Sequence, residues 1–194
     1  MTPNPIDLFG YPALPGVETC LDHVRNDAET VLANEIDRLD LAPFRFQQWT
    51  GKRLTTSFGW RYDFENGGFA RAEPIPDWLL PVRDSAASFA GLAPDALEQV
   101  LLTRYDPGAG IGWHRDRPVF DHVVGISLGA AATLRFRRRK PTGGFDRHSV
   151  ALPPRSAYHL SGEARWDWEH SIAPMDATRW SITFRSLRAP ASVG

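Results

Sequence analysis

A histidine and an aspartate, His114 and Asp116, lie two positions apart in the stretch Trp-His-Arg-Asp. Side chains two apart on an extended segment share a face, so the imidazole and the carboxylate can bind one ion together. The best candidate for a third ligand is His170, which follows Trp166 and Trp168 at a strand-like spacing of two. Two histidines and one carboxylate are the ligand set of non-haem Fe(II) oxygenases and leave coordination positions open. A His-x-Asp pair also occurs by chance, so the pattern needs support from elsewhere in the chain.

The second pattern that could do chemistry is the stretch 179–185, in which polar and apolar residues alternate without a break. On a strand, Trp180, Ile182 and Phe184 share one face, and the opposite face carries Arg179, Ser181, Thr183 and Arg185. The polar face either lines a site or faces solvent, and the alternation alone does not distinguish the two. At ~3.3 Å per residue the two arginines lie about 20 Å apart, so they serve one site only if the strand curves.

Strands must position these residues, and the chain offers many. Short apolar or alternating runs predict strands near 58–64, 100–102, 123–128, 133–137, 150–152, 157–160, 166–170 and 180–184. Helical spacing of apolar residues predicts helices over about 21–39 and 76–89, and residues 1–18, with four prolines, indicate an extended arm. Glu65-Asn66-Gly67-Gly68 has the composition of a hairpin turn. We therefore predict an α+β chain, mainly β, of the sandwich or jelly-roll type.

Composition narrows the class of protein. The 194 residues form one predicted domain, 1–194, and 42% hydrophobic residues are enough for a core. The net charge of −1 argues against a general polyanion binder, so any nucleic-acid contact must come from a local patch. The single cysteine, Cys20, excludes an internal disulfide. No apolar run is long enough to span a membrane and the start lacks a secretory pattern, so we expect a soluble cytoplasmic protein.

In its ordered set of motifs the chain resembles the AlkB family of Fe(II)- and 2-oxoglutarate-dependent dioxygenases. The motifs are Leu101-Leu102-Thr103-Arg104-Tyr105, Pro107-Gly108, His114-Arg115-Asp116, Ser161-Gly162-Glu163-Ala164-Arg165, His170-Ser171-Ile172 and the stretch 179–185. The resemblance covers roughly 52–188, because Lys52-Arg53 and Phe58-Gly59-Trp60-Arg61-Tyr62 are similar to the family's substrate-lid segment, here about 52–64. It implies a double-stranded β-helix with N-terminal helices.

The resemblance also assigns roles to single residues. His114, Asp116 and His170 would bind Fe(II) and so form the catalytic centre. The residues that would contact 2-oxoglutarate are Thr103, Tyr105, Arg179, Ser181 and Arg185, with Arg179 on the distal carboxylate and Arg185 near the metal-bound end. Thr103 and Ser181 stand where the founding member has asparagine, and Pro118 stands where it has an acidic residue that contacts the base.

The activity implied by this resemblance is oxidative dealkylation of N-alkylated bases in DNA or RNA. With Fe(II) as the metal cofactor, O₂ and 2-oxoglutarate would be consumed as co-substrates, with release of succinate, CO₂ and formaldehyde. A single-stranded or flipped-out base is the expected substrate. The enzyme is expected to be a monomer that does not associate with a membrane. Phe58, Trp60 and Tyr62 are the expected base-stacking residues, although they could equally be core residues. The basic run 135–140, with Arg137 and Arg138, is expected to contact phosphates, although it could equally be a solvated strand end.

Two alternatives stay open at this point. The same iron chemistry could act on a protein side chain or a small molecule. The net charge of −1 is compatible with this alternative, because it weakens the case for a nucleic-acid substrate. A non-catalytic jelly-roll binding module is the other alternative, although such a module has no need to keep three ligands and both arginines.

Overall fold

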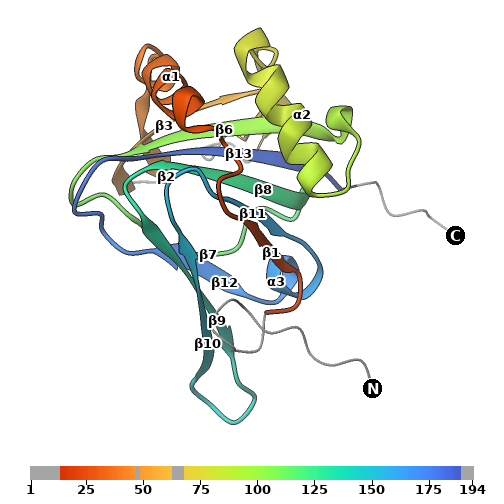
Figure 1. The fold of residues 1–194 in the computed structure, drawn as a ribbon. Coiled ribbons are helices and arrows are strands. Elements are labelled where there is room, and N and C mark those ends of the chain that lie inside the picture. Colours follow the sequence, from red (N-terminus) through yellow and green to blue (C-terminus); the bar gives the residue numbers. More distant parts are fainter. Residues whose placement is uncertain (1–13, 47–48, 63–67, 189–194) are drawn as a thin grey trace, which may run out of the picture.

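Strands are the main regular secondary structure in the computed structural model, which describes residues 14–46, 49–62 and 68–188 (Figure 1). The described strands are β1 (Val17–Cys20), β2 (Ala42–Phe46), β3 (Trp49–Phe58), β4 (Trp60–Tyr62), β5 (Phe69–Arg71), β6 (Leu97–Tyr105), β7 (Ile111–His114), β8 (Phe120–Gly129), β9 (Ala132–Arg139), β10 (Phe145–Leu152), β11 (Ala157–Leu160), β12 (Glu169–Ile172) and β13 (Arg179–Leu187). The predicted mainly-β class is confirmed.

Two antiparallel sheets form the jelly roll. The major sheet has seven strands in the order β1-β11-β8-β13-β6-β3-β2, and the minor sheet has four in the order β10-β9-β12-β7. A separate two-stranded sheet joins β4 to β5. The strand with the alternating pattern, β13, lies in the middle of the major sheet between β8 and β6. Residues on both faces of β13 are buried, because the helices cover one face of the major sheet and the minor sheet covers the other.

The helices α1 (Asn26–Asp37) and α2 (Leu80–Phe89) cover one face of the major sheet (Figure 1). A short 3₁₀ turn, η1 (Asp77–Leu79), leads into α2, and a second, η2 (Pro94–Ala96), leads into β6. The helix expected over 76–89 is therefore confirmed, whereas the first helix is shorter than expected. Within the expected range, Leu21 and Val31 are 53% and 58% exposed, and the helix contacts the core through Leu32 and Ile36.

Two apolar cores lie on the two sides of the major sheet. One packs α1 and α2 against the sheet and includes Leu97, Ile126, Ile182 and Phe184. The other lies between the sheets and includes Leu134, Phe136, Leu160 and Ile172. Past this core, β9 and β10 continue together as a hairpin that projects from the body of the molecule (Figure 1). No helix in the described part of the chain is long and apolar enough to cross a membrane.

Two sequence expectations need correction. Trp166 was placed on a strand with His170, but it ends a short helix, α3 (Gly162–Trp166), and only β12 after it is extended. Gly162 opens that helix with a φ of 45°, a left-handed value that glycine tolerates better than other residues. Much of the expected lid, 52–58, is an integral part of β3 in the major sheet. Residues 63–64, most of the turn at 65–68 and residues 1–13 of the arm lie outside the described residues.

Candidate metal and co-substrate site

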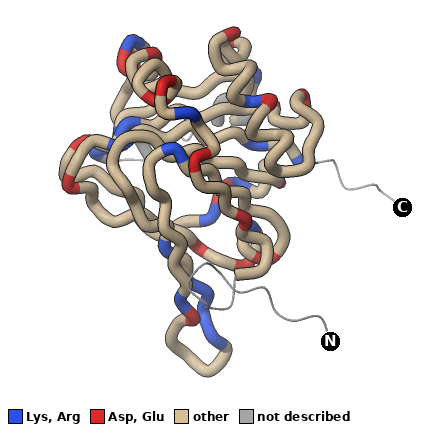
Figure 2. Tube along the Cα trace, viewed as in Figure 1, with Lys and Arg blue, Asp and Glu red and all other residues tan. Residues whose placement is uncertain are grey.

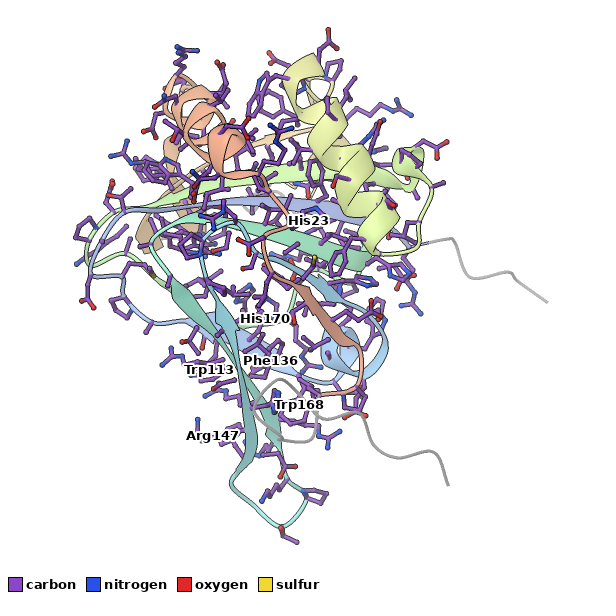
Figure 3. All side chains as sticks on the ribbon, viewed as in Figure 1. His23, Trp113, Phe136, Arg147, Trp168 and His170 are labelled. Atoms are coloured by element: carbon purple, nitrogen blue, oxygen red, sulfur yellow. The ribbon has the colours of Figure 1, made fainter. Side chains whose placement is uncertain are left out.

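The three predicted metal ligands converge between the sheets. His114 ends β7 and stands directly opposite His170 of β12 in the antiparallel register, and Asp116 follows two residues later. The potential ligand atoms of the three residues all lie within 4.8 Å of one another, and the two imidazole centres are 4.3 Å apart. Figure 3 shows His170 in the interior beside Phe136, whose ring centre is 6.2 Å away. Three donors in this arrangement fit a single Fe(II).

A backbone contact selects the coordinating nitrogen of His114. Its Nδ1 lies 2.9 Å from the carbonyl oxygen of Gly112, and because a carbonyl only accepts, Nδ1 carries the proton. The other nitrogen, Nε2, then has a free lone pair for a metal. This contact within β7 thus sets the imidazole in the tautomer that a metal needs.

The protonation states also suit a metal. Burial, followed by the neighbouring His114, lowers the pKa of His170 to about 3, and burial likewise lowers the pKa of His114. Burial alone would raise the pKa of Asp116, but Arg185 and the two imidazoles outweigh it and the net shift is downward. At neutral pH the site therefore holds two neutral imidazoles and one carboxylate, the forms that bind metal ions.

Arg185 holds the carboxylate of Asp116 in place. Its Nε and Nη2 both donate to Oδ1 of Asp116, at 2.9 Å and 2.8 Å, while Nη1 donates to Oε1 of Gln99 at 3.0 Å. The second carboxylate oxygen, Oδ2, is left facing Nε2 of His170 at 3.4 Å. An outer contact of this kind fixes the orientation of a ligand and tunes its basicity.

Arg179 is a fully buried guanidinium with free donors. Its side chain is 0% exposed, and Nε donates to the hydroxyl of Ser127 at 2.9 Å. Both Nη1 and Nη2 are buried without a hydrogen-bond partner, and the guanidinium carbon lies 5.2 Å from the ring centre of Tyr105. Buried unpaired donors on a charged group are costly, and a forked guanidinium is the natural partner of a carboxylate. The arrangement fits the distal carboxylate of 2-oxoglutarate.

The other residues expected to contact 2-oxoglutarate share the buried inner face of the major sheet with Arg179. Thr103 and Ser181 stand opposite each other on β6 and β13 and are 3% and 4% exposed, and Tyr105 is also buried. Ser181 is 3.3 Å from the hydroxyl of Thr183. The polar face of β13 is therefore directed inward, which settles the question that the alternation left open.

Four residues of this region escaped prediction. Ser127 and Gln99 orient the two arginines from neighbouring strands, and single polar residues within apolar strands give little signal in the sequence. Burial raises the pKa of Tyr158 to about 12, so it keeps its proton at neutral pH. Its ring fits only because Gly125 has no side chain: a Cβ there would lie 2.2 Å from Cζ of Tyr158. This complementarity depends on a register between β8 and β11 that the sequence does not reveal.

A cleft of about 1000 Å³ gives access to the metal ligands. His114, Asp116 and Arg185 line it, together with Trp113. Phe58 and Trp60 do not. Phe58 is 9% exposed and packs in the core beneath the helices, because the chain turns at Gly59 (φ 78°) and β3 belongs to the major sheet. Phe58 is therefore a core residue, which corrects its assignment to base stacking.

The remaining aromatic residues and the basic run have separate positions. Trp60 is half-buried and stacks with Arg71, whose guanidinium lies 5.3 Å from its ring centre. The side chain of Tyr62 lies outside the described part of the structure. Arg137 and Arg138 lie on β9 and form ion pairs, Arg137 with Glu169 at 2.6 Å and Arg138 with Glu163 at 2.7 Å.

Comparison with known proteins agrees with this geometry. A family profile of the 2OG-Fe(II) oxygenase superfamily matches residues 45–185. The chain is 27% identical over 164 residues to the tRNA (carboxymethyluridine(34)-5-O)-methyltransferase ALKBH8 of Macaca fascicularis, a match that covers 81% of this chain and 24% of that protein. It is 28% identical over 151 residues to the alpha-ketoglutarate-dependent dioxygenase AlkB of Salmonella typhimurium (strain LT2), a match that covers 66% of this chain and 67% of that protein. The chain spans only about a quarter to a half of the length of several curated relatives that it matches.

A solved structure agrees on the fold. "The structure of OsALKBH1" superposes with a TM-score of 0.70 at 15% identity and covers 90% of this chain and 98% of that one. The converging ligands, the unpaired guanidinium of Arg179 and the family match are independent observations that agree. The chain belongs to the 2OG-Fe(II) oxygenase superfamily and is AlkB-like within it.

Proposed function

We propose that this protein is an Fe(II)- and 2-oxoglutarate-dependent dioxygenase that removes N-linked alkyl groups from bases in nucleic acid. The observation that carries the dioxygenase assignment is the pairing of a three-ligand centre with the buried, unpartnered fork of Arg179. Together with O₂, the bound Fe(II) and 2-oxoglutarate supply an oxidant for the substrate C–H bond.

The side chains of this chain bind and orient the reactants. His114, Asp116 and His170 hold the metal, and Arg185 keeps Asp116 ionised and correctly turned. Arg179 holds the distal carboxylate of 2-oxoglutarate, and the hydrogen bond from its Nε to Ser127 fixes the orientation of the guanidinium plane. All of these groups except Asp116 lie on strands of the two sheets, and Asp116 is held by Arg185 of β13, so little reorganisation is needed when the reactants bind.

The nucleic-acid part of the proposal is supported by the hairpin beside the cleft. Register places Arg135, Arg137 and Arg139 of β9 on one face with Phe145 and Arg147 of β10. The guanidinium carbons of Arg135 and Arg137 lie 5.2 Å and 4.6 Å from the ring centre of Trp113, which lines the cleft. Figure 2 shows the basic residues gathered along the hairpin. A relative whose name specifies tRNA adds weight to a nucleic-acid substrate.

The opposite face of the hairpin is neutralised. Arg138 pairs with Glu163 and Asp146, and Lys140 also pairs with Asp146. Figure 3 shows Trp113 and Arg147 on one side of the hairpin and Trp168 on the other, where Arg138 stacks at 4.8 Å. The basic run thus divides into a face on which Arg137 pairs with Glu169 while Arg139 and Arg147 make no ion pair with the described residues, and a face engaged in internal ion pairs.

The test is a mass-resolved demethylation assay on methylated single- and double-stranded DNA and RNA oligonucleotides, with succinate measured in parallel. Coupled loss of one methyl group per succinate supports the proposal. Succinate released without any change to the oligonucleotides would place the substrate in another class, and no succinate at all would indicate a binding module.

The hairpin offers a matched pair of variants for the polymer contact. The double variant Arg139→Gln/Arg147→Gln should reduce the slope of log affinity against log salt by about 1.4 on single strands, because two phosphate contacts at ~0.7 each are lost. Arg138→Gln should leave that slope unchanged. Equal slopes in the wild type and the double variant would remove the hairpin from the interface.

A further inference from the structure

Positive charge dominates the cleft above the metal ligands. Among the described residues, two aspartates, Asp40 and Asp116, line it against five arginines: Arg53, Arg115, Arg117, Arg165 and Arg185. Asp116 is already engaged by Arg185 and by the metal position. Fe(II) and 2-oxoglutarate carry opposite charges of equal size, so their binding leaves this excess in place.

Arg53 is the least compensated of these charges. Its side chain is 8% exposed, and its guanidinium carbon lies 4.0 Å from the ring centre of Phe44. Its Nε is buried without a hydrogen-bond partner, and it makes no ion pair with a carboxylate of the described residues. The apolar ring holds the cation in position without neutralising it, so a charged donor faces the cleft.

Arg165 adds a second buried cation. It is 3% exposed, and its Nη2 donates to the backbone carbonyls of Arg117 at 2.7 Å and Phe120 at 2.6 Å, while its Nε has no partner. Burial is the main cause that lowers the pKa of both Arg53 and Arg165, although each guanidinium stays charged at neutral pH. A further cation in the cleft would add to this unfavourable charge, whereas an acceptor oxygen or an anion would relieve it.

We propose that the cleft discriminates between alkylated bases by their charge, with Arg53 as the specificity-determining residue. Bases that become cationic on methylation, such as 3-methylcytosine and 1-methyladenine, are disfavoured. Neutral or anionic bases that present a carbonyl oxygen, such as 3-methyluracil and 1-methylguanine, are favoured. This inference rests on the proposed function, because it specifies the substrate class of the same site.

The experiment compares pairs of methylated bases within one oligonucleotide sequence; 3-methyluracil is nearly isosteric with 3-methylcytosine, whereas 1-methylguanine also carries a 2-amino group that 1-methyladenine lacks. 3-Methylcytosine is compared with 3-methyluracil, and 1-methyladenine with 1-methylguanine, with kcat and KM measured for formaldehyde release at constant salt. Phosphate contacts are identical within a pair, so the ratio of kcat/KM reports only the base. Like-charge juxtaposition typically costs several kcal/mol, so we expect the neutral member of each pair to be favoured by on the order of 100-fold.

Variants assign the effect to Arg53. Arg53→Gln should reduce the preference about 10-fold through KM, and Arg53→Lys, which keeps the charge, should restore it. The control is Arg83→Gln. Arg83 lies on α2, outside the cleft, and pairs with Asp84, so this variant removes the same charge at a distance from the site. Thermal unfolding of each variant separates a folding defect from a loss of selectivity.

Three results would overturn the inference. Equal or better use of the cationic bases would refute charge selection while leaving the proposed function intact. An unchanged preference in a folded Arg53→Gln variant would remove Arg53 from that role. No formaldehyde from any of the four bases would overturn the proposed function and this inference together.

Discussion

Replacing Arg179 by methionine should weaken 2-oxoglutarate binding without weakening the ligand-free fold. The guanidinium is fully buried, and two of its nitrogens have no partner, so the ligand-free protein carries an unsatisfied charged group. Unsatisfied buried donors cost roughly 1–3 kcal/mol each, and an apolar side chain of similar length avoids that cost. We therefore expect the ligand-free Arg179→Met variant to be at least as stable as the wild type.

Ligand binding should change in the opposite direction. Removing one partner of a buried charged pair costs on the order of 2–5 kcal/mol, which corresponds to a rise in Kd for 2-oxoglutarate of about 30-fold or more. At a concentration of about 100 times the wild-type Kd, 2-oxoglutarate stabilises the wild type by about 2.7 kcal/mol and a variant with 30-fold weaker binding by about 0.9 kcal/mol. At about 2–4 °C per kcal/mol, the rise in Tm is roughly 5–11 °C against roughly 2–4 °C.

The assay is thermal unfolding with and without 2-oxoglutarate, with Mn(II) replacing Fe(II) to prevent turnover. Ser127→Ala is the graded control: it removes only the contact to Nε of Arg179, worth about 0.5–1.5 kcal/mol, so its Kd should rise by only about 2- to 12-fold. Arg179→Lys should resemble the methionine variant in affinity, because an ammonium does not reproduce the fork. A wild-type response to 2-oxoglutarate in Arg179→Met would show that another residue holds the carboxylate.

Three further predictions follow from the site and its packing. His114→Ala should abolish succinate release and the Tm rise produced by Mn(II), with an unchanged circular-dichroism spectrum; full turnover would contradict the ligand assignment. Asp116→Ala should lower stability by about 3–5 kcal/mol in urea unfolding, because it leaves Arg185 without its carboxylate, whereas Asp116→Asn should cost less. Gly125→Ala should lower stability by about 1–3 kcal/mol, because its Cβ would overlap the ring of Tyr158, and an unchanged Tm would show that the ring has room to move.

Local sequence predicted the chemistry of the centre well. The spacing of His114 and Asp116 and the order of motifs along the chain pointed to the three residues that the structure brings within 4.8 Å. Strand predictions were sound where alternation or apolar runs were long, as in β8 and β13. The prediction that Trp166 lies on a strand was wrong. A spacing of two also arises where a short helix is followed by a strand, and no local pattern marked the start of the helix at Gly162.

What the sequence determined by itself is the set of side chains on each face of a strand, since alternation follows from backbone geometry alone. Which face is inward depends on surfaces contributed by distant segments, and only the tertiary structure decides it. Covered on both sides, β13 directs Arg179 and Arg185 toward the ligands, and Phe58 joins the helix-side core instead of a base platform. The uncompensated charge of Arg53 likewise exists only in the fold, because a missing partner is a property of everything packed around a group and not of its neighbours in the chain.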